Sequence, residues 1–227
     1  MRWRFVLLRQ RSRVVQQRTA AANQLRGFGA EYGVIFPTGL RSLKTRVPEA
    51  LEDAANDLTA TAREVIAELM QEIRTLSERI DQMQRRLAEF SRHNPLSEQL
   101  QQIPGIGPLA SATFIAAAGR ARQFRNGRQC AAWIGLVPRA HGSGGKTRLL
   151  GISKNGNREL RTAFIHGARA LLLHAHKRND PLAVWASRVR QRQGWNKAVV
   201  ALANKLARIA WAVAATDQPY NPKLAAA

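Results

Sequence analysis

Between Ile66 and Phe90 the apolar residues recur at intervals that alternate between three and four positions, and mostly polar residues lie between them. This spacing is that of a heptad seam and predicts a long amphipathic helix. The seam consists of Ile66, Leu69, Ile73, Leu76, Ile80, Met83, Leu87 and Phe90. Pro48, followed by acidic residues, is expected to open the helix, and Asn94-Pro95 to end it.

A seam this narrow needs a partner helix, because one helix alone leaves its apolar stripe in water. We favour a coiled coil with a second copy of the chain, which predicts a homo-oligomer. The alternative is an antiparallel hairpin within one chain, formed with residues 48–62 or 5–26.

The pattern elsewhere is also helical. Residues 1–28 carry seven arginines and no acid on a helix-favouring background, and several glycines and Pro37 then form a linker. A short helix should end near Gly135, Asn157 should cap a helix that starts at Arg158, and residues 196–214 read as a last helix. Strand alternation is weak, so we expect a mainly α protein with a basic helix and linker (1–47), a coiled-coil helix (48–95) and a compact helical domain (96–227).

The sequence Ile-Pro-Gly-Ile-Gly-Pro at 103–108, followed by small residues, is typical of a helix-hairpin-helix turn. In such a turn Gly105 and Gly107 would let backbone N–H groups reach a phosphate at a helix N-terminus. A plain turn between two helices is the alternative.

The charge of the chain predicts the kind of partner that it binds. The chain of 227 residues has a formal charge of +21. Residues 120–227 hold 20 Lys and Arg against 3 Asp and Glu, a balance of +17, whereas residues 1–119 hold 16 against 12, a balance of +4. The C-terminal half is therefore expected to bind a polyanion, most simply nucleic acid. A solvated basic face with no partner is the alternative.

The stretch 141–161 concentrates this charge among glycines. Gly144 and Gly145 allow close backbone approach beside Ser143, and five basic residues surround it: Lys146, Arg148, Lys154, Arg158 and Arg161. We expect this loop to bind phosphate. Ser143 is either a hydrogen-bond donor or a nucleophile activated by this positive field and His141, and Ser153 is the rival serine.

Other chemistries find less support. The chain shows no carboxylate cluster for a two-metal nuclease, and Gly-Gly-Lys-Thr at 144–147 lacks the earlier glycine of a P-loop, since position 140 is Ala. Cys130 is alone, so we expect no disulfide and a buried thiol. The apolar N-terminal run is too short for a signal peptide, and Lys205 and Arg208 break the apolar stretch 198–215. A cytoplasmic protein with no membrane partner is expected.

The motifs at 103–108, 123–128, 131–139, 143–149 and 151–161 together closely resemble the C-terminal half of the Piv-like DEDD transposases of bacterial insertion sequences. Asp-Pro-Leu at 180–182, Arg-Gln-Gly-Trp-Asn-Lys-Ala at 192–198 and Ala-Asn-Lys-Leu-Ala-Arg-Ile-Ala-Trp at 203–211 continue the resemblance. It covers nearly the whole chain.

The resemblance implies a DNA-binding transposase that acts in DNA transposition and recombination, with a guide (bridge) RNA as a further partner. It matches Ser143 to the family's nucleophile. It also implies Mg²⁺ held by an Asp-Glu-Asp-Asp quartet in an N-terminal RuvC-like domain, which this chain is expected to lack, and no cofactor in this chain itself. A catalytically inactive nucleic-acid-binding remnant and a structure-specific helix-hairpin-helix protein are the alternatives, so enzymatic activity is an open question at this point.

Overall fold

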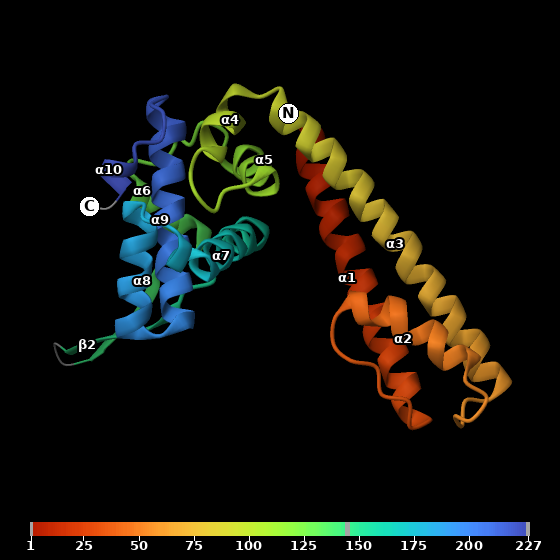
Figure 1. Ribbon diagram of the computed structural model, residues 1–227. Coiled ribbons are helices and arrows are strands. Elements are labelled where there is room, and N and C mark those ends of the chain that lie inside the picture. The colour runs from red at the N-terminus through yellow and green to blue at the C-terminus, as the bar shows by residue number, and fades with distance from the viewer. Residues whose placement is uncertain (1, 144–145, 226–227) are drawn as a thin grey trace. The chain divides into compact units, whose positions relative to one another are not determined.

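The computed structural model describes residues 2–143 and 146–225 and is mainly α-helical, as predicted (Figure 1). The chain divides into two compact units. We call residues 6–85 the three-helix unit and residues 86–227, together with residues 1–5, the C-terminal unit.

The three-helix unit is built from α1 (Arg2–Glu31), α2 (Leu40–Glu52) and most of α3 (Ala60–Arg92). In this unit α1 and α3 lie side by side with opposite chain direction (Figure 1). Leu25 near the end of α1 shares a buried cluster with Ile66 and Ile73, and Val14 nearer its start packs with Leu76 and Ile80. α2 adds Leu43 and Val47 to the first of these clusters.

The predicted heptad seam is therefore covered within one chain. Ile66, Ile73, Leu76 and Ile80 are each no more than 6% exposed, and Arg18 of α1 donates a hydrogen bond of 3.5 Å to Ser77 between them. The favoured expectation of a coiled coil with a second copy is thus not what these residues form. They follow the alternative, a hairpin with residues 5–26, because α1 brings its own apolar positions to the same stripe.

Three features of the three-helix unit differ from the predicted ones. The helix expected to run from Pro48 to Asn94 is broken at residues 53–59, between α2 and α3. Pro48 lies inside α2 rather than at a helix start, because Leu43 and Val47 before it are fully buried and hold the chain helical there. Gly29 belongs to α1, where a side chain would collide with the Phe36 ring. The connector between α1 and α2 is therefore shorter than the linker predicted from the sequence.

The C-terminal unit holds the remaining elements. These are α4 (Pro95–Gln101), α5 (Pro108–Ala118), α6 (Gly127–Ile134), β1 (Pro138–Ser143), β2 (Lys146–Ile152), α7 (Arg158–Leu173), a 3₁₀ turn (Ala175–Lys177), α8 (Pro181–Gln193), α9 (Trp195–Thr216) and α10 (Pro222–Ala225). The β1–β2 pair corrects the expectation of a loop at 141–152.

α9 is the central helix of the C-terminal unit and contacts α4, α6, α7 and α8 (Figure 1). Val199, Leu202, Leu206 and Val213 are buried on it as predicted. By length and composition α9 is the one helix among the described residues that could cross a membrane, but 56% of its apolar window is buried inside the protein. That burial is typical of a core helix, so a membrane protein is not indicated.

Three buried serines join α3, α4 and α5 where the chain enters this unit. Ser91, Ser97 and Ser111 are each at most 1% exposed. The hydroxyl oxygens of Ser91 and Ser97 lie 2.7 Å apart, those of Ser97 and Ser111 lie 2.8 Å apart, and Ser111 donates to the Pro108 carbonyl at 3.0 Å. These hydroxyls satisfy one another, which fixes the start of α5 against its neighbours.

Candidate nucleic-acid interface

The β1–β2 hairpin carries the serine and the nearest cations of the predicted phosphate loop. Its antiparallel register pairs His141 with Arg148 and Ser143 with Lys146. Since residues two apart along a strand and residues paired across it share one face, these four positions lie on the same face of the ribbon. The opposite face holds Ala140, Gly142, Thr147 and Leu149.

Both faces of this ribbon are open. Leu149 is 69% exposed, and the next residue, Leu150, is 41% exposed. His141 and Arg148 are exposed as well. In Figure 1 the hairpin extends away from the helices of its unit. His141 and Arg148 therefore lie on a face of the ribbon that no other described part of its unit covers.

Ser143 is the last residue of β1, at the tip of the hairpin. Gly144 and Gly145, predicted to contact nucleic acid, lie outside the described residues. The rival Ser153 lies at the base instead, where its backbone N–H donates to the Val137 carbonyl at 2.8 Å. The two serines are thus at opposite ends of the same ribbon.

The base of the hairpin is held by a contact between two turns. Gly135 ends α6 in a left-handed conformation, with φ of 80°, and the Lys154 N–H donates to its carbonyl at 3.2 Å. Gly156, with φ of 89°, approaches the Trp133 carbonyl so closely that a β-carbon would overlap it. Glycine is required at both points because other residues pay for positive φ and would collide with the facing backbone.

Arg161 has a structural role at the base of the hairpin. Its guanidinium donates to the Ile134 carbonyl at 2.8 Å and to the Asn155 carbonyl at 3.3 Å. Burial lowers the pKa of Arg161, and the neighbouring Arg158 lowers it further. Arg161 therefore links α7 to the two turns, and its hydrogen-bonding capacity is partly used within the protein.

Lys154 and Arg158 are different, because both side chains are exposed. They flank the N-terminus of α7, where the Asn157 side chain accepts a hydrogen bond from the Leu160 N–H, which confirms the predicted cap. A helix N-terminus with two exposed cations attracts an anion, and the hairpin base lies next to it in sequence.

The predicted helix-hairpin-helix turn lies elsewhere on the C-terminal unit. Gly105 has φ of 88° and packs its backbone against Gly167 in the middle of α7. Gly107 is exposed, and no side chain caps α5 at this end. Because Gly167 is nine positions after Arg158, the turn lies about 14 Å along α7 from the basic N-terminus. The site residues at 103–108 and 143–158 are thus two separate surfaces joined by one helix.

No group of three His, Cys, Asp or Glu residues suited to a metal occurs in the described part of the chain. Cys130 is fully buried, as expected, and burial raises the pKa of its thiol to about 12. It is therefore held as a neutral thiol in the core.

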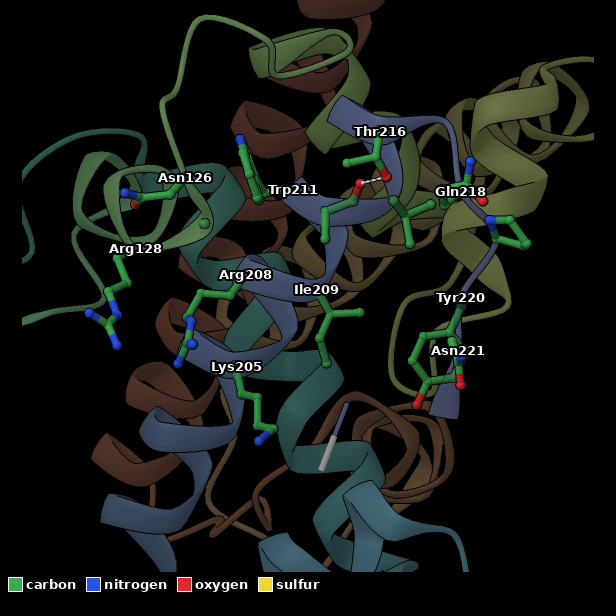
Figure 2. A pocket seen from close by; sticks show the side chains of 14 residues that line it. Asn126, Arg128, Lys205, Arg208, Ile209, Trp211, Thr216, Gln218, Tyr220 and Asn221 are labelled. Atoms are coloured by element: carbon green, nitrogen blue, oxygen red, sulfur yellow. Dashed lines mark hydrogen bonds between the residues drawn. The ribbon is translucent and has the colours of Figure 1, made fainter. Parts of the chain in front are cut away.

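A second cationic site lies on α9 and was not predicted from the sequence. Lys205, which the sequence shows as a break in the apolar stretch 198–215, is only 8% exposed and, with Arg128 and Arg208, lines a cavity (Figure 2). The available signal was the position of Lys205 and Arg208, three residues apart, inside this mostly apolar stretch.

Comparison with known proteins places these elements in context. Residues 97–183 match the model of the transposase IS116/IS110/IS902 family. The chain is 41% identical over 215 residues to the transposase for insertion sequence element IS1111A of Coxiella burnetii, covering 95% of this chain and 59% of that protein. It is 42% identical over 217 residues to a protein of Pseudomonas aeruginosa named as a probable family 20 transposase, covering 94% of this chain and 64% of that protein.

A third similar protein is the transposase for insertion sequence element IS1328 of Yersinia enterocolitica. It is 33% identical over 209 residues, which cover 91% of this chain and 61% of that protein. The chain thus spans about three fifths of the length of the curated relatives it matches.

Proposed function

The chain belongs to the IS116/IS110/IS902 transposase family, and from that premise we propose that it takes part in moving an insertion sequence by binding DNA through the β1–β2 hairpin and the start of α7. The observation that carries this proposal is the hairpin register. It puts Ser143, Lys146, His141 and Arg148 on one face of an exposed ribbon.

The charge of this region supports a phosphate backbone as the ligand. Arg148, Lys154 and Arg158 are exposed, and residues 120–227 carry 20 basic against 3 acidic residues. Contacts of this kind position a protein on DNA without reading its sequence. DNA sequence choice would then come from another source, and a guide RNA is the partner that the family resemblance suggests for this task.

We assign Ser143 the role of nucleophile. Its hydroxyl would lose a proton to a base, and its oxygen would attack the phosphorus of a phosphodiester. The bond from phosphorus to the leaving strand oxygen would break, and that oxygen would take a proton from the protonated base or from water and leave as a hydroxyl. A serine–DNA phosphodiester and a free DNA end would result. Lys146, paired with Ser143 in the hairpin register, and Arg148 would supply cations to stabilise the charge that develops on the phosphoryl oxygens.

Mg²⁺-dependent carboxylate chemistry is the other part of the proposed reaction. The described residues contain no group of three suitable ligands, so this part of the chain does not fit a catalytic Mg²⁺ site. The carboxylates would come from an RuvC-like domain outside the 227 residues. Binding, and not complete strand exchange, is the activity expected of the isolated chain.

The binding proposal predicts a steep dependence on salt. If about six phosphates are contacted, affinity for duplex DNA should fall about 10³-fold between 50 and 200 mM salt, which fluorescence anisotropy with a labelled duplex would measure. Arg148→Gln should reduce the magnitude of the salt slope by about one unit. Arg79→Gln, an equal loss of charge at an exposed position of α3, is the matched control and should leave the slope near the wild-type value. A wild-type affinity that does not change with salt would refute this interface.

The nucleophile proposal is tested in a strand-exchange assay supplied with a family RuvC-like domain. Ser143→Ala should keep DNA affinity and lose exchange and any covalent protein–DNA product. Ser153→Ala, at the base of the hairpin, should retain both. Exchange by the Ser143→Ala protein at the wild-type rate would remove Ser143 from the mechanism.

A further inference from the structure

A cavity of about 700 Å³ lies between the start of α6, one side of α9 and the segment that follows α9. Figure 2 shows Asn126, Arg128 and Arg208 on one side of this cavity and Gln218, Tyr220 and Asn221 on the other. All of these elements belong to the C-terminal unit, and none of the described residues of the hairpin interface lines the cavity.

The cationic side of the cavity is built by a close helix contact. Gly127, the first residue of α6, packs against the backbone of Arg208, where an added β-carbon would lie 3.0 Å from the Arg208 α-carbon. This contact brings Asn126 and Arg128 next to Arg208. A larger residue at position 127 would push the start of α6 away and separate the two arginines.

Lys205 adds a third positive charge one turn earlier on α9. Its ammonium lies 4.6 Å from the centre of the Trp185 ring, and burial together with Arg208 lowers the pKa of Lys205. Three cations in one cavity repel one another, so an anion bound among them would be attracted strongly.

No acidic residue is among the described residues that line the cavity. Asp217, the nearest acid in sequence, forms ion pairs with Arg120 and with Arg122, the latter at 3.3 Å. These pairs hold the turn after α9, where Asp217 has φ of 57°, and so support the segment that forms the far wall. The Asp217 carboxylate is engaged by these two arginines and is not among the residues that line the cavity.

The other lining side chains are mostly apolar or aromatic, and they include Ile209, Trp211, Val213, Pro219 and Tyr220. The Trp211 indole N–H donates a 3.2 Å hydrogen bond to the Phe124 carbonyl, which fixes the ring. A planar, partly polar group would find van der Waals contact here. The side-chain N–H groups of Asn126 and Asn221 could donate hydrogen bonds to it, because the oxygens of these amides already accept from backbone N–H groups. The volume lies in the range that holds a nucleotide-sized ligand.

We propose that this cavity binds one unpaired nucleotide of a DNA strand, with its base against the apolar wall and its phosphate near Arg128 and Arg208. The inference rests on the proposed function in taking DNA as the partner, but it names a different surface and a different feature of the DNA. The hairpin would hold the duplex backbone, and the cavity would hold a base that is out of the helix or at a single-stranded end.

The test compares two DNAs with the 227-residue protein, one a blunt duplex and the other the same duplex with a two-nucleotide single-stranded tail. A 2-aminopurine in the tail reports capture of the base. Stacking and one phosphate contact should make the tailed DNA bind at least about fivefold more tightly, with quenching of the 2-aminopurine signal. The Arg128→Gln/Arg208→Gln double variant should bind both DNAs with equal affinity and lose the quenching.

Arg148→Gln in the hairpin is the matched control and should weaken both DNAs alike while keeping the preference for the tail. Tyr220→Ala tests the apolar wall and should reduce the quenching without altering affinity for the blunt duplex. Equal wild-type affinity for both DNAs would overturn the inference, as would a preference for the tail that the double variant retains. Either result leaves the hairpin proposal intact, whereas failure to bind both DNAs would refute the proposed function.

Discussion

At the residue scale, the hairpin is positioned by glycines that permit backbone contact. Gly135 and Gly156 have positive φ and each lies against a facing backbone segment, Asn155 and Trp133 respectively. Such contacts leave no space for a side chain. The glycine-rich composition that suggested a phosphate loop is thus partly explained by the packing of turns.

Gly156→Ala should destabilise the C-terminal unit by more than about 2 kcal/mol, because alanine both adopts positive φ at a cost and overlaps the Trp133 carbonyl. Urea unfolding followed by circular dichroism measures the change. Gly151→Ala in β2, which has free space around its α-carbon and no positive φ, is the control and should change the free energy of unfolding by less than about 0.5 kcal/mol. Equal effects of the two variants would contradict this account.

Substitutions at Arg161 and Arg158 should separate an effect on protein stability from an effect on DNA binding. Arg161→Gln loses the hydrogen bonds to Ile134 and Asn155 and should lower the free energy of unfolding by about 1–2 kcal/mol. Arg158→Gln removes an exposed charge, so its stability should be close to that of the wild type while its DNA affinity falls. Paired unfolding and anisotropy measurements decide this, and a purely binding-defective Arg161→Gln protein would show the structural assignment to be wrong.

At the scale of elements, the heptad seam shows what periodicity predicts and what it leaves open. The pattern from Ile66 to Phe90 correctly indicated one long helix that ends before Asn94-Pro95. It could not choose the partner, since the same stripe can be covered by α1 or by a second chain. α1 was hard to recognise as that partner because arginines and glutamines are scattered among its apolar residues.

Leu76→Asp tests this assignment. A buried carboxylate opposite Val14 should lower the stability of the three-helix unit by about 3 kcal/mol or more without changing the molecular mass in solution. Thermal unfolding and multi-angle light scattering give the two readings. Thr75→Asp, at the exposed neighbouring position, should alter neither, and a halved mass for Leu76→Asp alone would restore the two-chain coiled coil.

The hairpin was missed because a two-stranded ribbon exposed on both faces has no buried stripe to impose alternation. Its strands contain glycine, arginine and lysine, which read as a loop. Its existence depends on cross-strand pairing and on the turn contact at its base, neither of which is visible in a local window. By contrast, the caps at Asn126, Asn157 and Asp180 depend on nearby residues, and Asn157 was correctly identified from sequence.

At the scale of the whole molecule, charge balance indicated which half should meet nucleic acid, but it did not locate every cation. Lys205 looked like an interruption in an apolar helix, whereas it is buried beside Trp185 and lines a cavity with Arg208. The contact between Gly127 and Arg208 that builds this cavity joins positions about eighty residues apart. No local pattern reveals such a contact, and only the folded C-terminal unit brings its two sides together.

The same fold should be sensitive to alkali through Cys130. Burial raises the pKa of its thiol from 9.0 to about 12, so the folded state favours the neutral form. The stabilising contribution is complete below about pH 9 and is lost as pH rises toward 12. Between pH 8 and 10.5 the wild type should lose about 2 kcal/mol more unfolding free energy than Cys130→Ala in urea titrations. Parallel pH profiles for the two proteins would contradict the buried neutral thiol.

The rate at which that cysteine reacts with a thiol reagent also measures how often the C-terminal unit opens. Cys130 is the sole thiol in the sequence and is fully enclosed in the C-terminal unit, so a thiol reagent can react with it only after that unit opens. The labelling rate at saturating reagent is then the opening rate itself. Adding DNA should lower this labelling rate if DNA binds the closed C-terminal unit. The labelling rate then reports DNA occupancy on an unmodified chain without any fluorescent tag.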